Sequence, residues 1–412
     1  MFHEEDGTRF YSPSSNAVNL RPSGPYHWVE PSLYFSKLNR GFSVELGIAS
    51  FPTREAFEHT VAPTDRWPVS DAWAYHDWHQ SEGGNTQELM HQLALQLGPF
   101  DSLSEFERRI QLFNYVDHQA IYEGMYAHLW KPNSGRMIWM TQPAWPSTMW
   151  QMYSSDYDTQ ASFYGIRKAN APLHVQMDLA DHTVQVVNTT LNEKPGLHVL
   201  ARVLSPQNET LATQETTLSA SANATTPLFV LPVEDLYKHH PLVFVRLELR
   251  DGAQTLLADN FYWVARDPES NRGMDKLGPA TLSAHVSQTA DVAATEGAER
   301  AWSIRLKNSG IDAAIALKLT ALHTDGTRLL PAYYSDNYIS LLPGEERTVT
   351  VQAPIAAVGA GAIHFALRGW NLADQTVAQD CSKHVGSAAP PVSPLRPEPV
   401  KKQKANQHAP GQ

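Results

Sequence analysis

The sequence has little cysteine, no basic block before its last residues and no long apolar run. Cys381 is the single cysteine among 412 residues, which excludes an internal disulfide framework and a cysteine-based metal cage. No apolar stretch approaches the roughly 20 residues that a membrane-spanning helix needs. The net charge of −11 argues against nucleic acid or an anionic membrane as a partner. The first residues, MFHEEDGTRF, lack the basic start and apolar core of a signal peptide.

Several motifs of cofactor and metal chemistry are also missing. The sequence contains no Walker loop, no dinucleotide fingerprint and no GxSxG elbow. His76, Asp77 and His79 lie together in YHDWHQSEGGN, but a His-x-x-His pair without a further placed ligand is a weak metal signal. We interpret this segment as a polar loop near a pocket and expect neither a metal nor a cofactor.

Tryptophan, in contrast, is concentrated in one part of the chain. Eight of the eleven tryptophans fall within the first 150 residues. Such a cluster is often core packing, but exposed indoles also stack against sugar rings. Composition alone leaves both interpretations open.

Residues 1–165 have the pattern of an α/β unit. Its strand-like runs are 9–15, 43–50 and 136–141. One helix is predicted between the N-cap Asn85 and Gly98, and the next begins with the capping-box pattern Ser-Leu-Ser-Glu at 102–105. A strand, a long helix and a further strand are typical of a parallel sheet or a barrel.

The rest of the chain is predicted to be β-rich. Short strand-like runs divided by turns predict an immunoglobulin-like β-sandwich over 170–266 and a second β-sandwich over 280–385. We expect a polar linker at 267–281. Residues 386–412 are rich in proline and polar residues and are predicted to be disordered.

The segment GFSVELGIASFPT contains the first chemical candidate. A regular strand would place Phe42, Val44, Leu46 and Ile48 on one side and Ser43, Glu45, Gly47 and Ala49 on the other. Glu45 then has only small residues on its own face, as expected where a strand lines a cavity. In a (β/α)8 barrel the first side would face the helices and Glu45 would point inward near the catalytic rim. The alternative is a structural glutamate in a salt bridge.

A second candidate lies in SGRMIWMTQPAWPSTMW, residues 134–150. Trp139 stands near the end of a buried strand and is followed by a proline-rich turn. A flat indole at this place would suit the floor of a sugar subsite. An ordinary aromatic core residue is the alternative.

Together these segments resemble glycoside hydrolase family 2, in its exo-β-D-glucosaminidase and β-mannosidase branch. In that family the strand of the nucleophile reads S-E-x-G-x-x-S-x-P, and SVELGIASFP matches it with one displaced residue, Val44 lying between Ser43 and Glu45. The most specific match is residues 137–176, which are similar to the last barrel strand and the segment after it. SGPYHWVEPSLYF and YYSDNYISLLPGEERTVTV match as well, so that the resemblance covers residues 8–375.

The resemblance implies that residues 1–165 are the C-terminal part of a (β/α)8 catalytic barrel. It implies a retaining β-glycosidase that hydrolyses β-glucosaminides or β-mannosides, with Glu45 as the nucleophile. Trp139 would stack in the subsite of the cleaved sugar, and Trp145 and His76 are expected to contribute to substrate binding. The expected partner is an oligosaccharide or polysaccharide.

The retaining mechanism also needs an acid/base carboxyl about 5–5.5 Å from the nucleophile. In the family this is a glutamate after an asparagine, about one helix upstream of the segment that DGTRFYSPSSN resembles. Glu4 and Glu5 fall where the family has the end of a helix, and neither is assigned this role. Since a full barrel needs about 250 residues, we interpret the chain as a C-terminal fragment that lacks the acid/base.

Two other hypotheses remain at this stage. In one, a separate upstream polypeptide completes the barrel. In the other, the chain is a non-catalytic carbohydrate-binding or assembly protein with a relic barrel. The location stays open, with a periplasmic or secreted parent enzyme as one interpretation.

Overall fold

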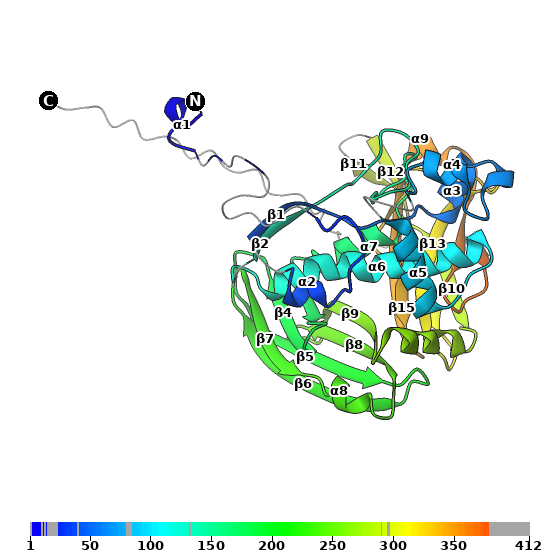
Figure 1. The fold of residues 1–412 in the computed structure, drawn as a ribbon. Coiled ribbons are helices and arrows are strands. Elements are labelled where there is room, and N and C mark those ends of the chain that lie inside the picture. The colour runs from blue at the N-terminus through cyan, green and yellow to red at the C-terminus, as the bar shows by residue number, and fades with distance from the viewer. Residues whose placement is uncertain are drawn as a thin grey trace.

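The structure is a computed structural model that describes most of the chain up to residue 378 (Figure 1). The described residues are 2–9, 11, 14, 24–38, 41–79, 85–131, 133–289, 291–294 and 297–378. The predicted disordered tail, residues 386–412, and most of the expected strand at 9–15 lie outside them.

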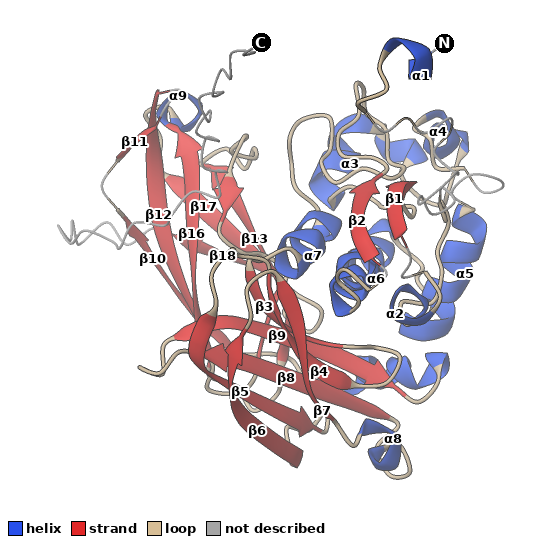
Figure 2. Ribbon diagram, turned by 90° about the vertical axis from the view of Figure 1, so that its left-hand side faces the viewer, coloured by secondary structure: helices blue, strands red, loops and turns tan. Residues whose placement is uncertain are grey.

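The N-terminal part is a helical unit around a small parallel sheet (Figure 2). Its helices are α1 (Phe2–Glu5), α2 (Leu33–Ser36), α3 (Arg54–Thr60), α4 (Asp71–Tyr75), α5 (Thr86–Leu97), α6 (Leu103–Ala127) and α7 (Ala161–Ala169), with a 3-10 helix, η1, at Pro63–Asp65. The sheet pairs β1 (Gly41–Leu46) with β2 (Asn133–Ile138) in parallel, and helices α3 to α6 form the connection between them. Two strands do not establish a barrel, so the (β/α)8 part of the fold stays a prediction.

Both helices predicted from capping signals are confirmed. Helix α5 begins after Asn85, whose side chain accepts a hydrogen bond from the Glu88 amide, and it ends before Gly98. Helix α6 begins after Ser102, whose hydroxyl accepts from the Glu105 amide at 3.3 Å. Each side chain satisfies an amide that the first helical turn leaves free.

The next part of the chain forms two antiparallel sheets packed face to face. Its elements are β3 (Leu173–Met177), β4 (Thr183–Asn188), β5 (Lys194–Leu204), β6 (Thr210–Ala220), β7 (Ala224–Val230), α8 (Val233–Leu236), β8 (Leu242–Arg250) and β9 (Leu256–Ala265). One sheet has the order β3–β4–β7 and the other β6–β5–β8–β9. Alternate apolar residues such as Val199 and Val245 fill the space between the sheets.

A second pair of sheets follows. Its elements are β10 (Leu282–Gln288), β11 (Val292–Ala294), β12 (Gly297–Asn308), β13 (Ala314–His323), β14 (Tyr333–Tyr334), β15 (Ile339–Leu341), β16 (Glu346–Pro354), α9 (Ile355–Val358), β17 (Ile363–Arg368) and β18 (Gln375–Ala378). One sheet has the order β10–β12–β16–β14, with β11 also on β12, and the other β15–β13–β17–β18. Trp302 and Phe365 meet between them with ring centres 5.9 Å apart.

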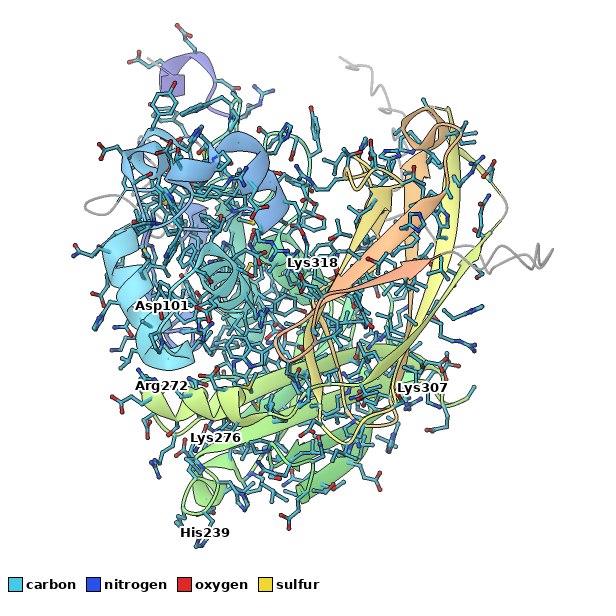
Figure 3. All side chains as sticks on the ribbon, turned by 90° about the vertical axis from the view of Figure 1, so that its right-hand side faces the viewer. Asp101, His239, Arg272, Lys276, Lys307 and Lys318 are labelled. Atoms are coloured by element: carbon cyan, nitrogen blue, oxygen red, sulfur yellow. The ribbon has the colours of Figure 1, made fainter. Side chains whose placement is uncertain are left out.

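The expected linker at 267–281 is instead largely structured. Residues Pro268–Lys276 form a 3-10 helix, η2, which begins after Asp267. Arg272 on η2, labelled in Figure 3, donates hydrogen bonds to two carbonyl oxygens of α5. Met274 is almost fully buried. The polar composition suggested a linker, but this one apolar residue and the arginine attach the segment to the helical unit.

The helical unit packs against both pairs of sheets. Their shared core contains Phe106 of α6, Phe244 of β8 and Ile315 of β13. At another junction, Lys318 of β13 lies 3.0 Å from a carboxylate oxygen of Glu55 on α3 (Figure 3). These contacts join the helical unit, which contains β1 and β2, to both pairs of sheets.

Candidate active site

A β-bulge interrupts β1 next to Glu45. The pairs on either side of it are Ser43 with Arg136 and Leu46 with Ile138. Between these pairs β1 has two residues, Val44 and Glu45, whereas β2 has one. Val44, which lies between Ser43 and Glu45 where the family pattern has a serine directly before the glutamate, is one of these two residues.

The bulge changes which side chains of β1 are buried. Ser43 and Leu46 are both 1% exposed, while Val44 and Glu45 are half-buried. The predicted strict alternation is therefore wrong in this half of the strand, because an inserted residue shifts every side chain before it to the other face. The strand also ends at Leu46, earlier than the predicted Ser50.

Glu45 is held by a tyrosine that the sequence analysis did not single out. The Tyr26 hydroxyl donates a hydrogen bond to Glu45 Oε2 at 2.7 Å. Tyr26 is fixed in turn, since Trp150 Nε1 donates to its carbonyl oxygen at 2.9 Å. A phenol donor at this distance orients the carboxyl group. Within the described residues Glu45 has no ion-pair partner, so the salt-bridged alternative has no support there. The sequence held one indication of this role, because Tyr26 lies in SGPYHWVEPSLYF, a segment that matches the family.

A glycine brings Trp139 close to the end of β1. A Cβ atom at Gly47 would lie 1.9 Å from the carbonyl oxygen of Trp139, so only glycine fits here. The Trp139 amide donates to the carbonyl oxygen of Leu46 at 2.8 Å. Trp139 follows β2 directly, and its side chain is 40% exposed. The structure therefore brings Glu45 and Trp139 to the same ends of neighbouring strands.

Trp145 and His76 form a separate pair. Their rings stack with centres 5.4 Å apart at 28°, and His76 Nδ1 lies 2.6 Å from the Pro146 carbonyl oxygen. His76 caps the end of α4, and Tyr75 packs edge-on against Trp145. Trp145 is 40% exposed and Tyr75 is 72% exposed, which makes a solvent-facing aromatic patch. The sequence analysis did not predict a role for Tyr75, although this residue directly precedes His76 in YHDWHQSEGGN.

Most of the other early tryptophans belong to the core. Trp73 and Trp78 are fully buried in a cluster with Phe51, Phe57 and Phe106. For these the core-packing interpretation holds. Among the described parts of the chain, no group of three or more metal-binding side chains is assembled, and no helix is long and apolar enough to cross a membrane.

Comparison with known proteins agrees with this reading of the sequence. The family described as exo-β-D-glucosaminidase Ig-fold domain matches residues 260–372. The chain is 27% identical to an exo-β-D-glucosaminidase of Streptomyces avermitilis, over 89% of this chain and 44% of the relative. It is also 27% identical to a mannosylglycoprotein endo-β-mannosidase of Lilium longiflorum, over 90% of this chain and 46% of the relative.

A solved structure shares the fold. The crystal structure of the Amycolatopsis orientalis exo-chitosanase CsxA superposes with a TM-score of 0.78 at 23% identity, over 89% of this chain and 46% of that chain. The chain thus spans about half the length of the relatives that it matches. The resemblance to the exo-β-D-glucosaminidase and β-mannosidase branch of glycoside hydrolase family 2 is confirmed, and so is an immunoglobulin-like fold in the C-terminal part.

Proposed function

We propose that this homologue of family 2 glycosidases carries the nucleophile side of a retaining β-glycosidase site for β-glucosaminides or β-mannosides. Glu45 attacks the anomeric carbon as the bond from that carbon to the leaving-group oxygen breaks, which forms a covalent glycosyl-enzyme that water then hydrolyses. Trp139 stacks against the sugar that is cleaved. The substrate class rests on the relatives, which are exo-β-D-glucosaminidases and a β-mannosidase by name. The observation that carries the proposal is the half-buried Glu45 carboxylate, held by Tyr26 beside an exposed Trp139.

The contacts of Glu45 fit the role of a nucleophile. A nucleophile must be held in a fixed direction, and the hydrogen bond from Tyr26 orients the Glu45 carboxyl group. The exposed face of Trp139 supplies a flat apolar surface of the kind that sugar rings stack on. Trp145 and His76 are proposed to contact the more distant part of a longer substrate.

The acid/base partner is assigned to none of the described residues. A positioned acid contributes about 10²–10⁴-fold to such a reaction, so we expect negligible turnover of natural oligosaccharides by this chain alone. A substrate whose leaving group needs no proton tests the nucleophile separately from the acid. Fluoride is such a leaving group, and a fluorine at C2 slows hydrolysis of the covalent intermediate so that it accumulates.

The first prediction concerns covalent labelling. Incubation of the chain with 2-deoxy-2-fluoro-β-D-mannosyl fluoride should add one sugar per chain, and peptide mapping by mass spectrometry should find it on Glu45. Glu45→Gln should remain unlabelled because an amide does not form the glycosyl ester. Glu88→Gln, an exposed change of the same kind on α5, should label like the unchanged chain.

Two results would contradict the proposed nucleophile. One is a sugar attached to a carboxylate other than Glu45, and the other is an unlabelled wild-type chain at saturating reagent. The second candidate function, carbohydrate binding without catalysis, is favoured by the exposed aromatic patch of Trp145 and Tyr75. Polysaccharide binding that is equal in the wild type and in Glu45→Gln, with no labelling of either, would support that alternative.

A further inference from the structure

Trp150 contacts three segments of backbone at the candidate site. It lies in the loop after β2 and is half-buried, and its Nε1 donates a hydrogen bond to the Tyr26 carbonyl oxygen at 2.9 Å. Its own carbonyl oxygen accepts a hydrogen bond at 2.9 Å from the amide of Met140, the residue after Trp139. A Cβ atom at Gly47 would lie 3.6 Å from Trp150 Cδ1, so the indole also packs against the end of β1. Trp150 therefore links the surroundings of the candidate nucleophile to those of the candidate stacking residue.

The hydrogen bond from the indole lies where it determines the direction of the Tyr26 side chain. The peptide unit before Tyr26 is attached to the end of β1, because the Gly47 amide donates to the Pro25 carbonyl oxygen at 3.1 Å. The peptide unit after Tyr26 is attached to Trp150 Nε1. Together the two hydrogen bonds hold the backbone on both sides of the Tyr26 Cα atom, and so they fix the direction in which its side chain leaves. The phenol reaches Glu45 Oε2 at 2.7 Å from this position.

The backbone of Trp150 has an uncommon conformation. Its φ of 59° lies in the left-handed region, which bulky residues rarely adopt. Such conformations persist where the surrounding contacts fix them, and they are frequent at functional sites. The hydrogen bonds of the indole and of the carbonyl oxygen are contacts of this kind, and they hold the indole in one place.

We propose that Trp150 is a positioning residue for Glu45, which it holds through Tyr26 in the direction that attack on the anomeric carbon requires. The inference rests on the proposed function, because it gives Trp150 a part in that same reaction. Loss of the indole N–H would release the peptide unit after Tyr26, and the phenol would no longer hold Glu45 in one orientation. A carboxylate that samples several orientations reacts more slowly, even though its chemistry is unchanged.

The rate of covalent labelling of the full chain by 2-deoxy-2-fluoro-β-D-mannosyl fluoride tests the proposal. Trp150→Phe keeps an aromatic ring but removes the N–H donor, and it should lower the labelling rate constant at saturating reagent by about tenfold. Tyr26→Phe removes the hydroxyl that contacts Glu45 and should lower the same rate constant by about tenfold or more.

The double variant Tyr26→Phe with Trp150→Phe shows whether Trp150 acts through Tyr26. It should label as fast as Tyr26→Phe alone, because without the phenol hydroxyl the direction of residue 26 no longer affects Glu45. A merely structural effect of Trp150→Phe would instead slow labelling to the same extent with and without that hydroxyl.

Trp130→Phe is the matched control. Trp130 also has a left-handed backbone, with φ 66°, and its Nε1 donates to the Asn223 carbonyl oxygen at 3.1 Å. It precedes β2, whereas Trp139 follows β2, so the two tryptophans lie at opposite ends of that strand. Trp130→Phe should label at the wild-type rate, and the thermal midpoint of each variant is measured alongside.

The possible results separate this inference from the proposed nucleophile. Equal labelling rates of the wild type and Trp150→Phe would overturn the positioning role and leave the nucleophile in place. An equal effect of Trp150→Phe with and without the Tyr26 hydroxyl would overturn it as well. An unlabelled wild type would contradict the proposed nucleophile itself and the positioning role with it.

Discussion

At the scale of single residues, the surroundings of Glu45 depend on one β-bulge and one glycine. The bulge formed by Val44 and Glu45 leaves Glu45 half-buried rather than in regular alternation. Gly47 then allows the backbone of Trp139 to approach the end of β1. Bulges often redirect a side chain beside a functional site, and here the redirected side chain is the candidate nucleophile.

Gly47→Ala should disturb this arrangement. Its Cβ would lie 1.9 Å from the Trp139 carbonyl oxygen, so the two strand ends must move apart. We expect a loss of about 1–3 kcal/mol in the free energy of unfolding, measured by urea denaturation with tryptophan fluorescence.

Gly361→Ala is the matched control, because an added Cβ meets no atom within 4 Å there. It should leave the urea midpoint nearly unchanged. Equal urea midpoints for the two variants would show that the Trp139 carbonyl oxygen does not prevent a larger residue from replacing Gly47.

At the scale of elements, the helices follow their local signals. Helix α6 begins where the capping pattern predicts, although the Glu105 side chain accepts from the amide of Asp101 rather than from that of Ser102. Its buried residues recur along most of its 25 positions, since the helix packs against α2 and α7 as well as against the sheets. The capping residue Ser102 therefore sets where α6 begins, and packing against its neighbours sets how much of α6 is buried.

Ser102→Ala tests the cap of α6. The substitution removes the acceptor of the Glu105 amide and should cost about 0.5–2 kcal/mol of stability. The measurement is the urea midpoint followed by circular dichroism. Ser219→Ala, an exposed change in β6, should be almost neutral. Equal urea midpoints for Ser102→Ala and Ser219→Ala would show that the Ser102 cap contributes little to stability.

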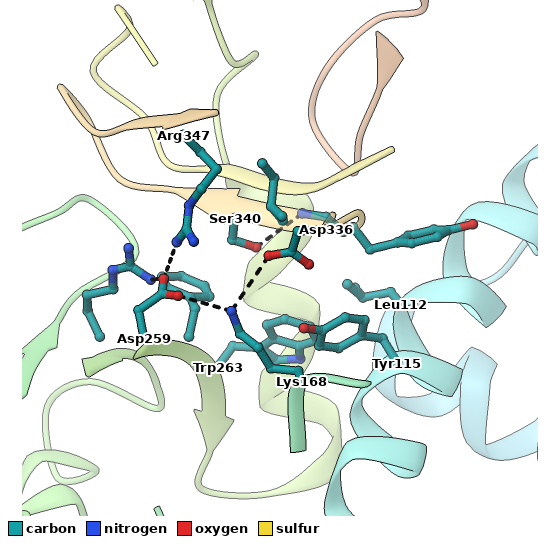
Figure 4. Close-up of a pocket in the computed structure, with 13 residues that line it drawn as sticks. Leu112, Tyr115, Lys168, Asp259, Trp263, Asp336, Ser340 and Arg347 are labelled. Atoms are coloured by element: carbon teal, nitrogen blue, oxygen red, sulfur yellow. Dashed lines mark hydrogen bonds and ion pairs between the residues drawn. The ribbon is translucent and has the colours of Figure 1, made fainter. Parts of the chain in front are cut away.

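At the scale of the whole molecule, one buried carboxylate joins three parts of the chain (Figure 4). Asp259 of β9 lies 3.0 Å from Lys168 of α7 and 2.6 Å from Arg246 of β8, and it also pairs with Arg347 of β16. The helical unit and both pairs of sheets therefore meet at a single charge. Burial disfavours that charge, but the three cations outweigh burial and hold the pKa of Asp259 well below its usual range.

Asp259→Asn should destabilise the junction strongly. The variant leaves buried cations without their partner, and breaking a buried ion pair in this way costs about 3–5 kcal/mol. Thermal unfolding at pH 7 is the measurement. Asp291→Asn, which removes an exposed partner of Arg300, should cost no more than about 1 kcal/mol.

The same carboxylate predicts a pH dependence. Because the folded pKa is depressed, its contribution to stability is present above the usual value of 3.8 and is lost as the pH falls through the folded pKa. Between about pH 5 and pH 2 the thermal midpoint of the wild type should therefore fall more steeply than that of Asp259→Asn. Parallel curves for the two proteins would contradict this role of Asp259.

The sequence by itself determined the local elements and the candidate nucleophile. Helices α5 and α6 could be located because caps and apolar spacing act within a few residues of the chain, and Glu45 was found from its family pattern. Only the tertiary structure decided which distant side chains meet. Tyr26 against Glu45 and Lys168 against Asp259 result from packing between elements far apart in sequence. No local pattern encodes such contacts, because they depend on the register and orientation of whole elements.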